Sequence, residues 1–392
     1  MRAMMAYDKL AGPVPRMLVL RSRYWLDDAA INAARQLRWE VETVPVVQEG
    51  RLPRDAIERL LTTLGLFKPD FVLSVNLAGM DLDGLFAGLF EDLQVPYVTW
   101  FVDDPRTIIM GRSIYASPYA VALTWEPAYR GYLLEVGFPE VHYMPLAVDA
   151  TVFNAEPAET WEFPPTFVGN SMAEFAEREW VWLNQHAELA AAMRRAFEEG
   201  LVTRKRFAVG LSALLPDELV GRLDEHERRH AELVFFIEGT RRLRRDLIGR
   251  LAREGLEVRG DDAWREVVQS AKPAVSYTGA LPAFYRACEI NVNTTSIQMP
   301  TAVNQRVFDG PAAGGFLLTD AQSALQDLFD RRDEVVCYES VEQCAELLQW
   351  YRRHPAARRD VVSRARKRIL SDHTYLHRLK AIASILQERF GG

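Results

Sequence analysis

Short apolar segments alternate with longer amphipathic segments along the first third of the sequence, and this alternation restricts the possible folds more than any other feature. The apolar segments at 17–20, 71–75, 97–102 and 120–124 have the length and residue types of buried strands. The stretches between them have the apolar spacing of helices. Strands that alternate with helices form right-handed crossovers and a parallel, doubly wound sheet. The N-terminal part is therefore predicted to be Rossmann-like.

The same alternation returns in the second half, after a proline-containing stretch at 149–165 that we interpret as a linker. Strands are predicted at 166–169, 233–237, 257–259, 274–277, 290–293 and 316–318, and a charged helical insertion fills most of 174–230. A chain of 392 residues exceeds what one core usually supports. We expect two Rossmann-like domains over 1–160 and 161–370, with a ligand cleft between them. A C-terminal helix over 371–392 is expected to pack back toward the N-terminal domain.

Composition and missing motifs exclude several classes of protein. A formal charge of −7 disfavours a general nucleic-acid binder, which needs a basic surface. The turn after the first strand has no G-x-G-x-x-G pattern, which disfavours a dinucleotide dehydrogenase. The three cysteines are scattered, as expected of buried reduced thiols. No segment has the roughly 20 apolar residues that cross a bilayer, and no secretory signal precedes residue 16. We expect a cytoplasmic protein, with peripheral membrane contact left open.

Small and polar residues follow the predicted strands of the second half, at the edge where a parallel sheet binds ligands. Gly279 ends one such segment and lets a ligand ring approach the backbone. Arg306 lies in a predicted helix over 303–311, and its guanidinium can bind two phosphate oxygens at once. The helix N-terminus near Thr301 also suits a diphosphate. The candidate binding residues are Gly169, Asn170, Tyr277, Thr278, Gly279, Asn293, Thr294, Thr295, Asn304, Arg306, Asp309, Gly314 and Gly315.

The segment from Tyr277 to Asp320 resembles the donor-binding half of retaining glycosyltransferases of the GT-B type. More closely, it is similar to the CgeB-like group, named for a spore-maturation protein. Further matches are 100–105, 167–170 and the late His373-Thr374-Tyr375 with Arg378, which would fasten the domains together. The resemblance runs from about residue 97 to the C-terminus and is weakest over 174–230. It implies an α/β fold of two Rossmann-like doubly wound domains facing across a cleft, with a helical insertion early in the C-terminal domain.

This resemblance implies transfer of a sugar from a nucleoside diphosphate sugar, most naturally a UDP-sugar, to a protein, glycan or cell-surface acceptor. The domain over 1–160 would hold the acceptor, and the domain over 161–370 would hold the nucleotide-sugar. Arg306 would stabilise the leaving diphosphate, while Asn304 and Asp309 would place the sugar or the ribose. Thr301 and Asp309 stand where many members carry two glutamates, so retention or inversion of configuration stays open.

Asp103 and Asp104 directly follow a predicted buried strand and, with Arg306, form the predicted catalytic set. One of these carboxylates could accept a proton from an acceptor hydroxyl. Pro105 favours an extended Asp104, so the two side chains diverge and only one is expected to face the cleft. We choose Asp103 as the base. The competing interpretation is that one of the two caps the following turn.

Other charged residues are interpreted structurally. Asp81 and Asp83 match a D-x-D metal motif of another glycosyltransferase fold, but they precede a helix and indicate an N-cap. Glu126 before Pro127 indicates the start of a helix. The arginine runs at 241–245 and 364–368 are typical of solvated helix faces. No group of histidine, cysteine and carboxylate residues has metal-ligand spacing, so no metal and no cofactor is expected.

Two alternative functions stay open. A nucleotide-sugar epimerase of the same double-Rossmann build would convert its ligand without an acceptor. A catalytically silent sugar-nucleotide-binding module of a glycosylation or spore-coat assembly would bind without turnover, and Thr301 in place of an acid keeps that possibility open. Gly314 and Gly315, taken alone, are more typical of a helix C-cap than of a ligand contact.

Overall fold

The polypeptide divides into two compact units, and each is described separately. Unit 1 comprises Met1–Asp149 together with Thr374–Gly392, and unit 2 comprises Ala150–His373. The structure is a computed structural model that describes residues 5–22, 24–46, 54–81, 83–109, 114 and 117–391. The last helix of the chain therefore belongs to the same unit as the N-terminal sheet.

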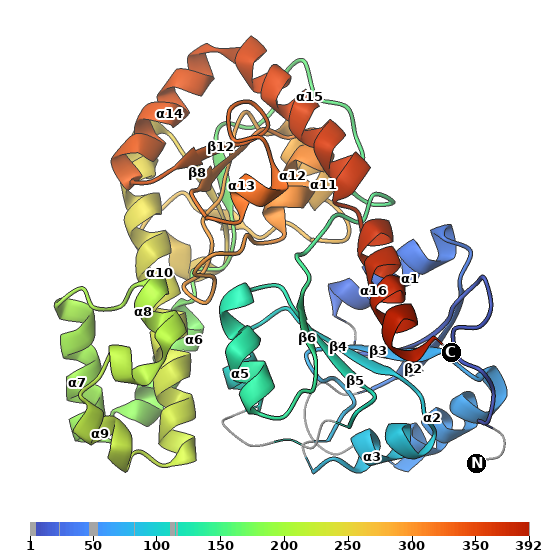
Figure 1. Cartoon of the computed structure of the whole chain (residues 1–392). Helices are drawn as coiled ribbons and strands as arrows, with labels where there is room; N and C mark the ends of the chain where they lie inside the picture. The colour runs from blue at the N-terminus through green and yellow to red at the C-terminus, as the bar shows by residue number, and fades with distance from the viewer. Residues whose placement is uncertain are drawn as a thin grey trace. The chain divides into compact units, whose positions relative to one another are not determined.

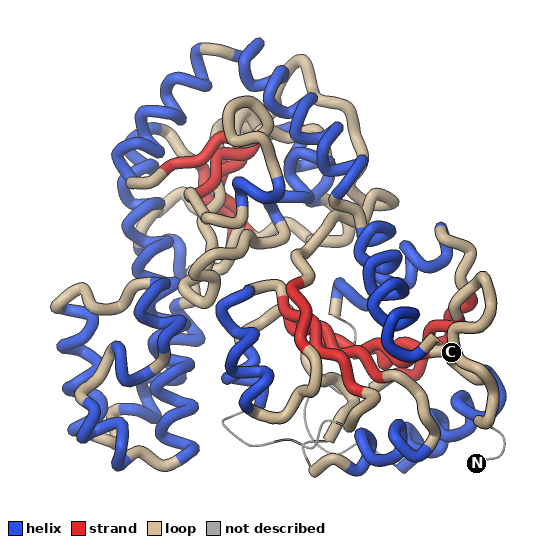
Figure 2. Tube along the Cα trace, in the orientation of Figure 1, coloured by secondary structure: helices blue, strands red, loops and turns tan. Residues whose placement is uncertain are grey.

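Unit 1 contains a parallel sheet that has, among the described residues, six strands in the order β2-β1-β3-β4-β5-β6 (Figures 1 and 2). Strands β3, β4 and β5 are buried along their whole length, which explains their continuous apolar runs. The strands are β1 (Arg16–Arg21), β2 (Glu40–Pro45), β3 (Phe71–Val75), β4 (Tyr97–Phe101), β5 (Ala120–Thr124) and β6 (Val141–Tyr143). The helices are α1 (Trp25–Gln36), α2 (Arg54–Phe67), α3 (Leu85–Asp92), α4 (Pro105–Ile109), α5 (Arg130–Glu135) and α16 (Tyr375–Phe390).

Helix α16 packs beside α1 and completes the core of unit 1 (Figure 1). The ring of Tyr375 lies 6.2 Å from that of Trp25 and 5.9 Å from that of Trp100, measured between centroids. The guanidinium of Arg378 donates hydrogen bonds to the carbonyl oxygens of Pro145 and Leu146, at 2.8 and 3.0 Å. A buried arginine with carbonyl partners holds the segment after β6 in place.

Unit 2 also contains a parallel sheet, which has six strands within the described part of the chain, in the order β12-β11-β10-β7-β8-β9. The strand order reverses between β7 and β10, the place where doubly wound sheets bind ligands. The strands are β7 (Thr166–Val168), β8 (Glu257–Gly260), β9 (Lys272–Pro273), β10 (Asn291–Val292), β11 (Leu317–Asp320) and β12 (Val336–Tyr338). The helices beside this sheet are α11 (Leu281–Ala287), α12 (Arg306–Ala312), α13 (Leu325–Leu328), α14 (Val341–Arg353) and α15 (Pro355–Asp372).

A helical insertion follows β7 and has a hydrophobic core of its own (Figure 1). It consists of α6 (Ala173–Leu183), α7 (Ala187–Glu198), α8 (Arg204–Val209), α9 (Asp217–Arg222) and the first half of α10 (Glu225–Leu251). The first half of α10 buries Val234 and Phe235 in the core of the insertion. Its second half buries Leu247 and Leu251 against the sheet. One uninterrupted helix thus belongs to both cores.

Two predicted strands of unit 2 are wrong. Residues 233–237 lie inside α10, because this apolar run faces the insertion as a helix and never reaches the sheet. The strand predicted at 274–277 is replaced by β9, which ends at Pro273. Proline cannot donate a ladder hydrogen bond, and such residues are confined to sheet edges and strand ends.

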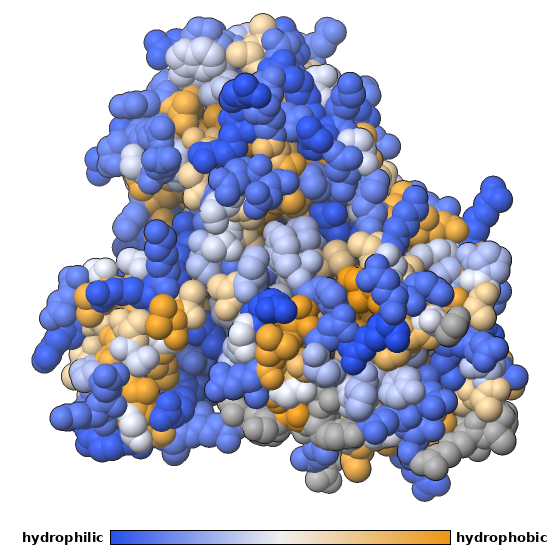
Figure 3. All heavy atoms as spheres, in the orientation of Figure 1, coloured by the Kyte–Doolittle hydropathy of each residue, from blue (hydrophilic) through white to orange (hydrophobic). Residues whose placement is uncertain are grey.

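The arginine-rich helices of unit 2 carry charge on the surface. Figure 3 shows mostly hydrophilic atoms over the upper part of the molecule, where α14 and α15 lie. In the run at 364–368 each arginine has an acidic partner: Arg364 pairs with Asp333, Arg366 with Glu156, and Arg368 with Glu334. Among the described residues, no helix is both long and apolar enough to cross a membrane.

Candidate functional site

A cavity of about 540 Å³ lies at the carboxyl edge of the sheet in unit 2, where the strand order reverses. Its size falls within the range of small-molecule sites, about 300–1,000 Å³. The walls come from the loops after β7, β8, β9 and β10, from α11, from the start of α12, and from one face of α10. The residues that line it are Val168, Gly169, Asn170, Met172, Phe236, Thr240, Arg244, Gly260, Asp261, Ala274, Val275, Tyr277, Leu281, Tyr285, Ser296, Gln298, Met299, Asn304, Gln305, Arg306 and Asp309.

Two glycines bring the loops after β7 and β8 close together at the floor of the cavity. A Cβ on Gly169 would lie 3.0 Å from the Phe167 ring and 3.2 Å from Nη2 of Arg306. A Cβ on Gly260 would lie 2.2 Å from the carbonyl oxygen of Gly169. The same oxygen accepts a 2.7 Å hydrogen bond from Nε1 of Trp264, which belongs to the short helix Asp262–Glu266. Only glycine at position 260 permits this close approach.

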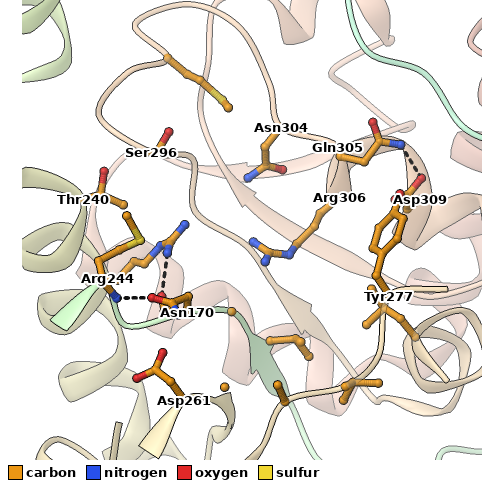
Figure 4. A pocket seen from close by; sticks show the side chains of 18 of the residues that line it. Asn170, Thr240, Arg244, Asp261, Tyr277, Ser296, Asn304, Gln305, Arg306 and Asp309 are labelled. Carbon is orange, nitrogen blue, oxygen red and sulfur yellow. Dashed lines mark hydrogen bonds between the residues drawn. The ribbon is translucent and has the colours of Figure 1, made fainter. Parts of the chain in front are cut away.

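Two arginines place positive charge in this cavity. Arg306 is the first residue of α12, and its Nη1 donates to Oδ1 of Asn293 at 3.4 Å. Arg244 lies on α10, and its Nη1 donates to the Asn170 carbonyl at 2.6 Å. In Figure 4 the Arg306 guanidinium points into the middle of the cavity, with Arg244 to one side of it. Tyr277 and Asp309 lie on the other side.

These two guanidinium groups form no ion pair among the described residues, although Asp261 and Asp309 also line the cavity and the charge of Asp261 acts on Arg244. Arg241 and Arg242 on the same helix form ion pairs with Glu238, whereas within the described part of the chain neither Arg244 nor Arg306 has a carboxylate oxygen within 4.0 Å. The buried Nε of Arg244 also lacks a hydrogen-bond partner among the described residues. Burial, followed by the charge of Arg306, lowers the pKa of Arg244 to about 9. Arg244 still carries its charge at neutral pH, so the cavity favours an anion.

Asn304 and Asn293 form a reciprocal amide pair beside Arg306. Nδ2 of Asn304 donates to Oδ1 of Asn293 at 3.0 Å, and Nδ2 of Asn293 donates back at 3.1 Å. The Asn293 amide also donates to the Thr319 hydroxyl at 2.9 Å. These contacts fix the segment between β10 and α12, and with it the backbone that leads into Arg306. Helix α12 begins at Arg306, later than the predicted start at 303.

Asp309 is fully buried at the other end of the cavity. Its Oδ2 accepts a 2.8 Å hydrogen bond from the Tyr277 hydroxyl, and its Oδ1 accepts a 2.7 Å hydrogen bond from Nε2 of Gln305. The carboxylate therefore orients a tyrosine ring and an amide that both line the cavity. A charge-assisted hydrogen bond is stronger than a neutral one, so this end of the cavity is held rigidly.

The structure brings six of the predicted binding residues together on the cavity wall: Gly169, Asn170, Tyr277, Asn304, Arg306 and Asp309. The others are not among the lining residues: Thr278, Gly279, Asn293, Thr294, Thr295, Gly314 and Gly315. Gly314 has φ +81°, and a Cβ there would lie 2.6 Å from the Glu156 carbonyl oxygen. A Cβ on Gly315 would lie 2.4 Å from the Tyr285 carbonyl oxygen. Backbone packing is sufficient reason for this glycine pair.

Sequence reasoning missed the residues that α10 contributes. Phe236, Thr240 and Arg244 follow one another at intervals of four, which places them on one face of the helix, and all three line the cavity. That spacing was visible in the sequence. The predicted strand over 233–237 and the predicted solvated face over 241–245 divide this helix face between two elements, so the sequence analysis does not identify it. Arg244 is the exception within that run, while Arg241 and Arg242 have partly or largely exposed side chains.

A second group of polar residues lies at the carboxyl edge of the sheet in unit 1. Oδ2 of Asp103 accepts hydrogen bonds from Nδ2 of Asn76 at 2.8 Å and from the Tyr24 hydroxyl at 3.3 Å. Asn76 and Leu77 both have positive φ, 52° and 58°. Backbone strain of this kind occurs at functional sites, where the surrounding structure maintains it. The three polar residues follow β1, β3 and β4, around the point where this sheet reverses its strand order.

The contacts of Asp104 give its side chain a structural role. It is fully buried, and its carboxylate accepts hydrogen bonds from Nη2 of Arg106 at 2.6 Å and from the Tyr129 hydroxyl at 3.1 Å. The adjacent Asp103 is only partly buried. The two side chains thus diverge, as the extended backbone before Pro105 predicts.

Two other acidic candidates, Asp81 and Glu126, cap the starts of helices. Asp81 accepts hydrogen bonds from the backbone N–H groups of Leu85 and Phe86, both at 2.8 Å, and Glu126 accepts from that of Ala128 at 3.1 Å. Within the described ranges, no three histidine, cysteine or acidic side chains come close enough together to hold a metal ion.

The sequence and the structure were compared with those of known proteins. Residues 228–384 match the family described as glycosyl transferase-like. Sucrose-phosphate synthase from Thermosynechococcus elongatus is similar in structure, with a TM-score of 0.52 at 10% identity over 96% of this chain and 99% of that one. Anabaena HepE in complex with UDP and glucose has a TM-score of 0.51 at 9% identity over 95% and 99% of the two chains.

A third similar structure is T4 phage BGT in complex with its UDP-glucose substrate, with a TM-score of 0.50 at 8% identity over 96% and 98% of the two chains. Among curated proteins no sequence match was found. The predicted fold class is confirmed, because the two parallel sheets with flanking helices match GT-B structures. The chain thus has the GT-B glycosyltransferase fold, and its residues 228–384 are similar to the glycosyl transferase-like family.

Proposed function

We propose that this protein is a glycosyltransferase that takes a nucleoside diphosphate sugar in the cavity of unit 2, with a UDP-sugar as the most natural donor. The observation that carries the proposal is the pair of guanidinium groups, Arg244 and Arg306, that share the cavity and form no ion pair within the described part of the chain, while the lining carboxylate of Asp261 is held by Ser171 and that of Asp309 by Tyr277 and Gln305. A diphosphate supplies the negative charges that this pair lacks. The GT-B fold and the UDP complexes of two similar structures are consistent with this choice.

In the proposed reaction an acceptor oxygen forms a bond to the anomeric carbon of the donor sugar. The bond between that carbon and the β-phosphate oxygen breaks, and the nucleoside diphosphate leaves with the electron pair. Arg306 and Arg244 stabilise the charge that develops on the leaving group. We assign this role to the arginines and therefore propose a transfer that needs no metal ion. Asn304 and the glycine loop at 169 place the phosphates, and Tyr277 with Asp309 places the ribose.

Unit 1 is proposed to bind the acceptor, with Asp103 taking the proton of its hydroxyl group. Asp103 is suited to this role because it is partly exposed and because Asn76 and Tyr24 hold its carboxylate. Asp104 is excluded from the role by its buried pair with Arg106. We propose a glycan, a protein or a cell-surface polymer as the acceptor, in line with the resemblance to the CgeB-like group.

Nucleotide binding tests the proposal directly. We expect UDP-sugars to raise the unfolding temperature of the wild-type protein and to release UDP slowly in the absence of an acceptor. Arg306→Ala should weaken UDP-sugar binding about 10- to 100-fold, since a hydrogen bond to a charged group contributes about 1.5–3 kcal/mol. Arg245→Ala is the matched control, because Arg245 lies on the exposed surface of α10. Unchanged affinity in Arg306→Ala would refute the donor site.

A further inference from the structure

The helical insertion contributes residues to the cavity through α10, and this suggests that the insertion takes part in ligand binding. Phe236 and Thr240, from the part of α10 nearest the insertion, line the cavity. The loop after β10 faces them with Ser296 and Gln298, which are buried and also line the cavity. We call the group formed by Thr240, Ser296 and Gln298 the hydroxyl end of the cavity. Thr240 and Ser296 lie to the side of Arg306 opposite Tyr277 and Asp309 (Figure 4).

Ser296 has an unsatisfied hydroxyl at this end. The residue is 7% exposed, and its Oγ has no hydrogen-bond partner among the residues that the structure describes. A buried hydroxyl without a partner is unfavourable, because it loses its hydrogen bonds to water and gains none in return. Thr240 is fully buried, and its Oγ1 accepts a 3.2 Å hydrogen bond from the backbone N–H of Ile297. The Thr240 hydroxyl keeps a proton that it can donate. Both groups can therefore bind a ligand hydroxyl.

The insertion also holds the loop that carries Ser296. Arg204 on α8 donates to the backbone carbonyl of Thr295 at 2.7 Å and to that of Ser296 at 3.3 Å. The same guanidinium pairs with Asp320 at 2.6 Å. Ile297 belongs to the hydrophobic core of the insertion. The position of the Ser296 hydroxyl thus depends on the insertion through a charge pair and through apolar packing.

The order of groups along the cavity matches the order of groups in a nucleotide-sugar. The guanidinium of Arg306 occupies the middle, where the diphosphate would lie. Tyr277 gives the first end an aromatic ring, which suits a flat base and its ribose. The second end presents hydroxyl and amide groups, which suit a polyol. A nucleoside diphosphate sugar carries its base and its sugar on opposite sides of the diphosphate.

We propose that the helical insertion forms the subsite that recognises the transferred sugar, with Thr240 and Ser296 hydrogen-bonded to its hydroxyl groups. The inference rests on the proposed function of the cavity. It assigns donor selection to residues that the inserted helices place and hold, rather than to the acid that stands at the position of Thr301 in many GT-B enzymes.

The test compares the affinity for UDP with the affinity for UDP-glucose, UDP-galactose and UDP-N-acetylglucosamine, measured by titration calorimetry. Ser296→Ala is expected to weaken binding of the preferred UDP-sugar about 2- to 10-fold, the net contribution of one or two neutral hydrogen bonds. Its affinity for UDP should change less than about twofold. Ser363→Ala, on the exposed face of α15, is the control and should change neither affinity.

A second pair of variants separates recognition from folding. Thr240→Ser keeps the hydroxyl and should keep the preference among sugars, whereas Thr240→Val removes it and should flatten that preference at unchanged UDP affinity. Thermal unfolding of each variant confirms that it is folded. If Ser296→Ala and Thr240→Val bind every UDP-sugar as the wild type does, the sugar subsite is refuted while the donor cavity stands. If the wild type binds neither UDP nor any UDP-sugar, the proposed function fails as well.

Discussion

The close approach at Gly260 gives a prediction that depends on geometry alone. A Cβ there would lie 2.2 Å from the Gly169 carbonyl oxygen and 2.7 Å from Cδ1 of Trp264. Ordinary van der Waals contacts of a Cβ begin at 3.4 Å. Gly260→Ala must therefore push the loop at Gly169 away from the Trp264 ring and break the 2.7 Å hydrogen bond between them.

Two terms set the size of the effect. A buried donor and acceptor left without partners are unfavourable by about 1–3 kcal/mol. Overpacking by one methyl group adds about 1–3 kcal/mol. We expect a total destabilisation of about 2–6 kcal/mol, which lowers the unfolding midpoint of unit 2 by roughly 4–24 °C at about 2–4 °C per kcal/mol. Because Gly169 lines the cavity, affinity for the donor should fall with it.

Scanning calorimetry of Gly260→Ala beside Gly249→Ala measures the effect. Gly249 lies in α10, and the nearest heavy atom to a Cβ there is 3.8 Å away. That control gains up to about 1 kcal/mol of helix propensity and should be neutral or stabilising. An unfolding midpoint of Gly260→Ala within about 1 °C of the wild type would refute the steric argument. So would an equal loss of stability in Gly249→Ala.

Three further predictions concern charge. Arg244→Met removes one of the two guanidinium groups from the cavity and should weaken nucleotide affinity about tenfold or more in titration calorimetry, since a hydrogen bond to a charged group contributes about 1.5–3 kcal/mol; an unchanged affinity would contradict this. Burial lowers the pKa of His230, so the folded state binds its proton less readily than the unfolded state, and stability should fall as the pH drops below about 6.5. His230→Phe keeps a ring stacked on Trp182, and its unfolding midpoint should depend less on pH than that of the wild type. An equal dependence of the midpoint on pH would exclude this histidine as the cause. Asp103→Asn should reduce sugar transfer about 10²- to 10⁴-fold at unchanged donor affinity, and full turnover in a product assay would remove Asp103 from the reaction.

The sequence predicts the architecture correctly where a short stretch of residues is enough to determine the local structure. Strands β3 and β5 occupy the predicted residues 71–75 and 120–124, because a strand buried on both faces is a short apolar run between turn residues. The order of strands and helices then determines a doubly wound sheet, and the GT-B class followed from the order of motifs in the second half. Both depend on patterns only a few residues long.

The error in α10 shows where such patterns fail. Val234 and Phe235 are buried by the insertion, and the neighbouring apolar positions leave no clear helical period in this short run. From its sequence alone, a short run of β-branched and aromatic residues without a helical period cannot be distinguished from a strand. These residues form a helix because they pack against the other helices of the insertion. The consequence for function was direct, because Thr240 and Arg244 belong to that helix.

The site itself was predicted in part, for a related reason. Arg306, Asn304 and Asp309 line the cavity because a short stretch around α12 positions all of them. Gly314 and Gly315 are needed for positive φ and for backbone contact, and a glycine in sequence looks the same whether a ligand or another strand is its neighbour. The sequence contains the requirement for a glycine but not the identity of the neighbour.

The return of α16 to unit 1 has a consequence for biosynthesis. The ribosome releases the strands β1–β6 first, yet Tyr375 and Arg378, which pack against and hold these strands, follow only after the whole of unit 2. At about 5–20 residues per second this interval is on the order of ten to forty seconds. During it the nascent sheet exposes the surface around Trp25 and Trp100 that α16 later covers. Chaperones that bind exposed aromatic surface would meet this nascent chain at that stage.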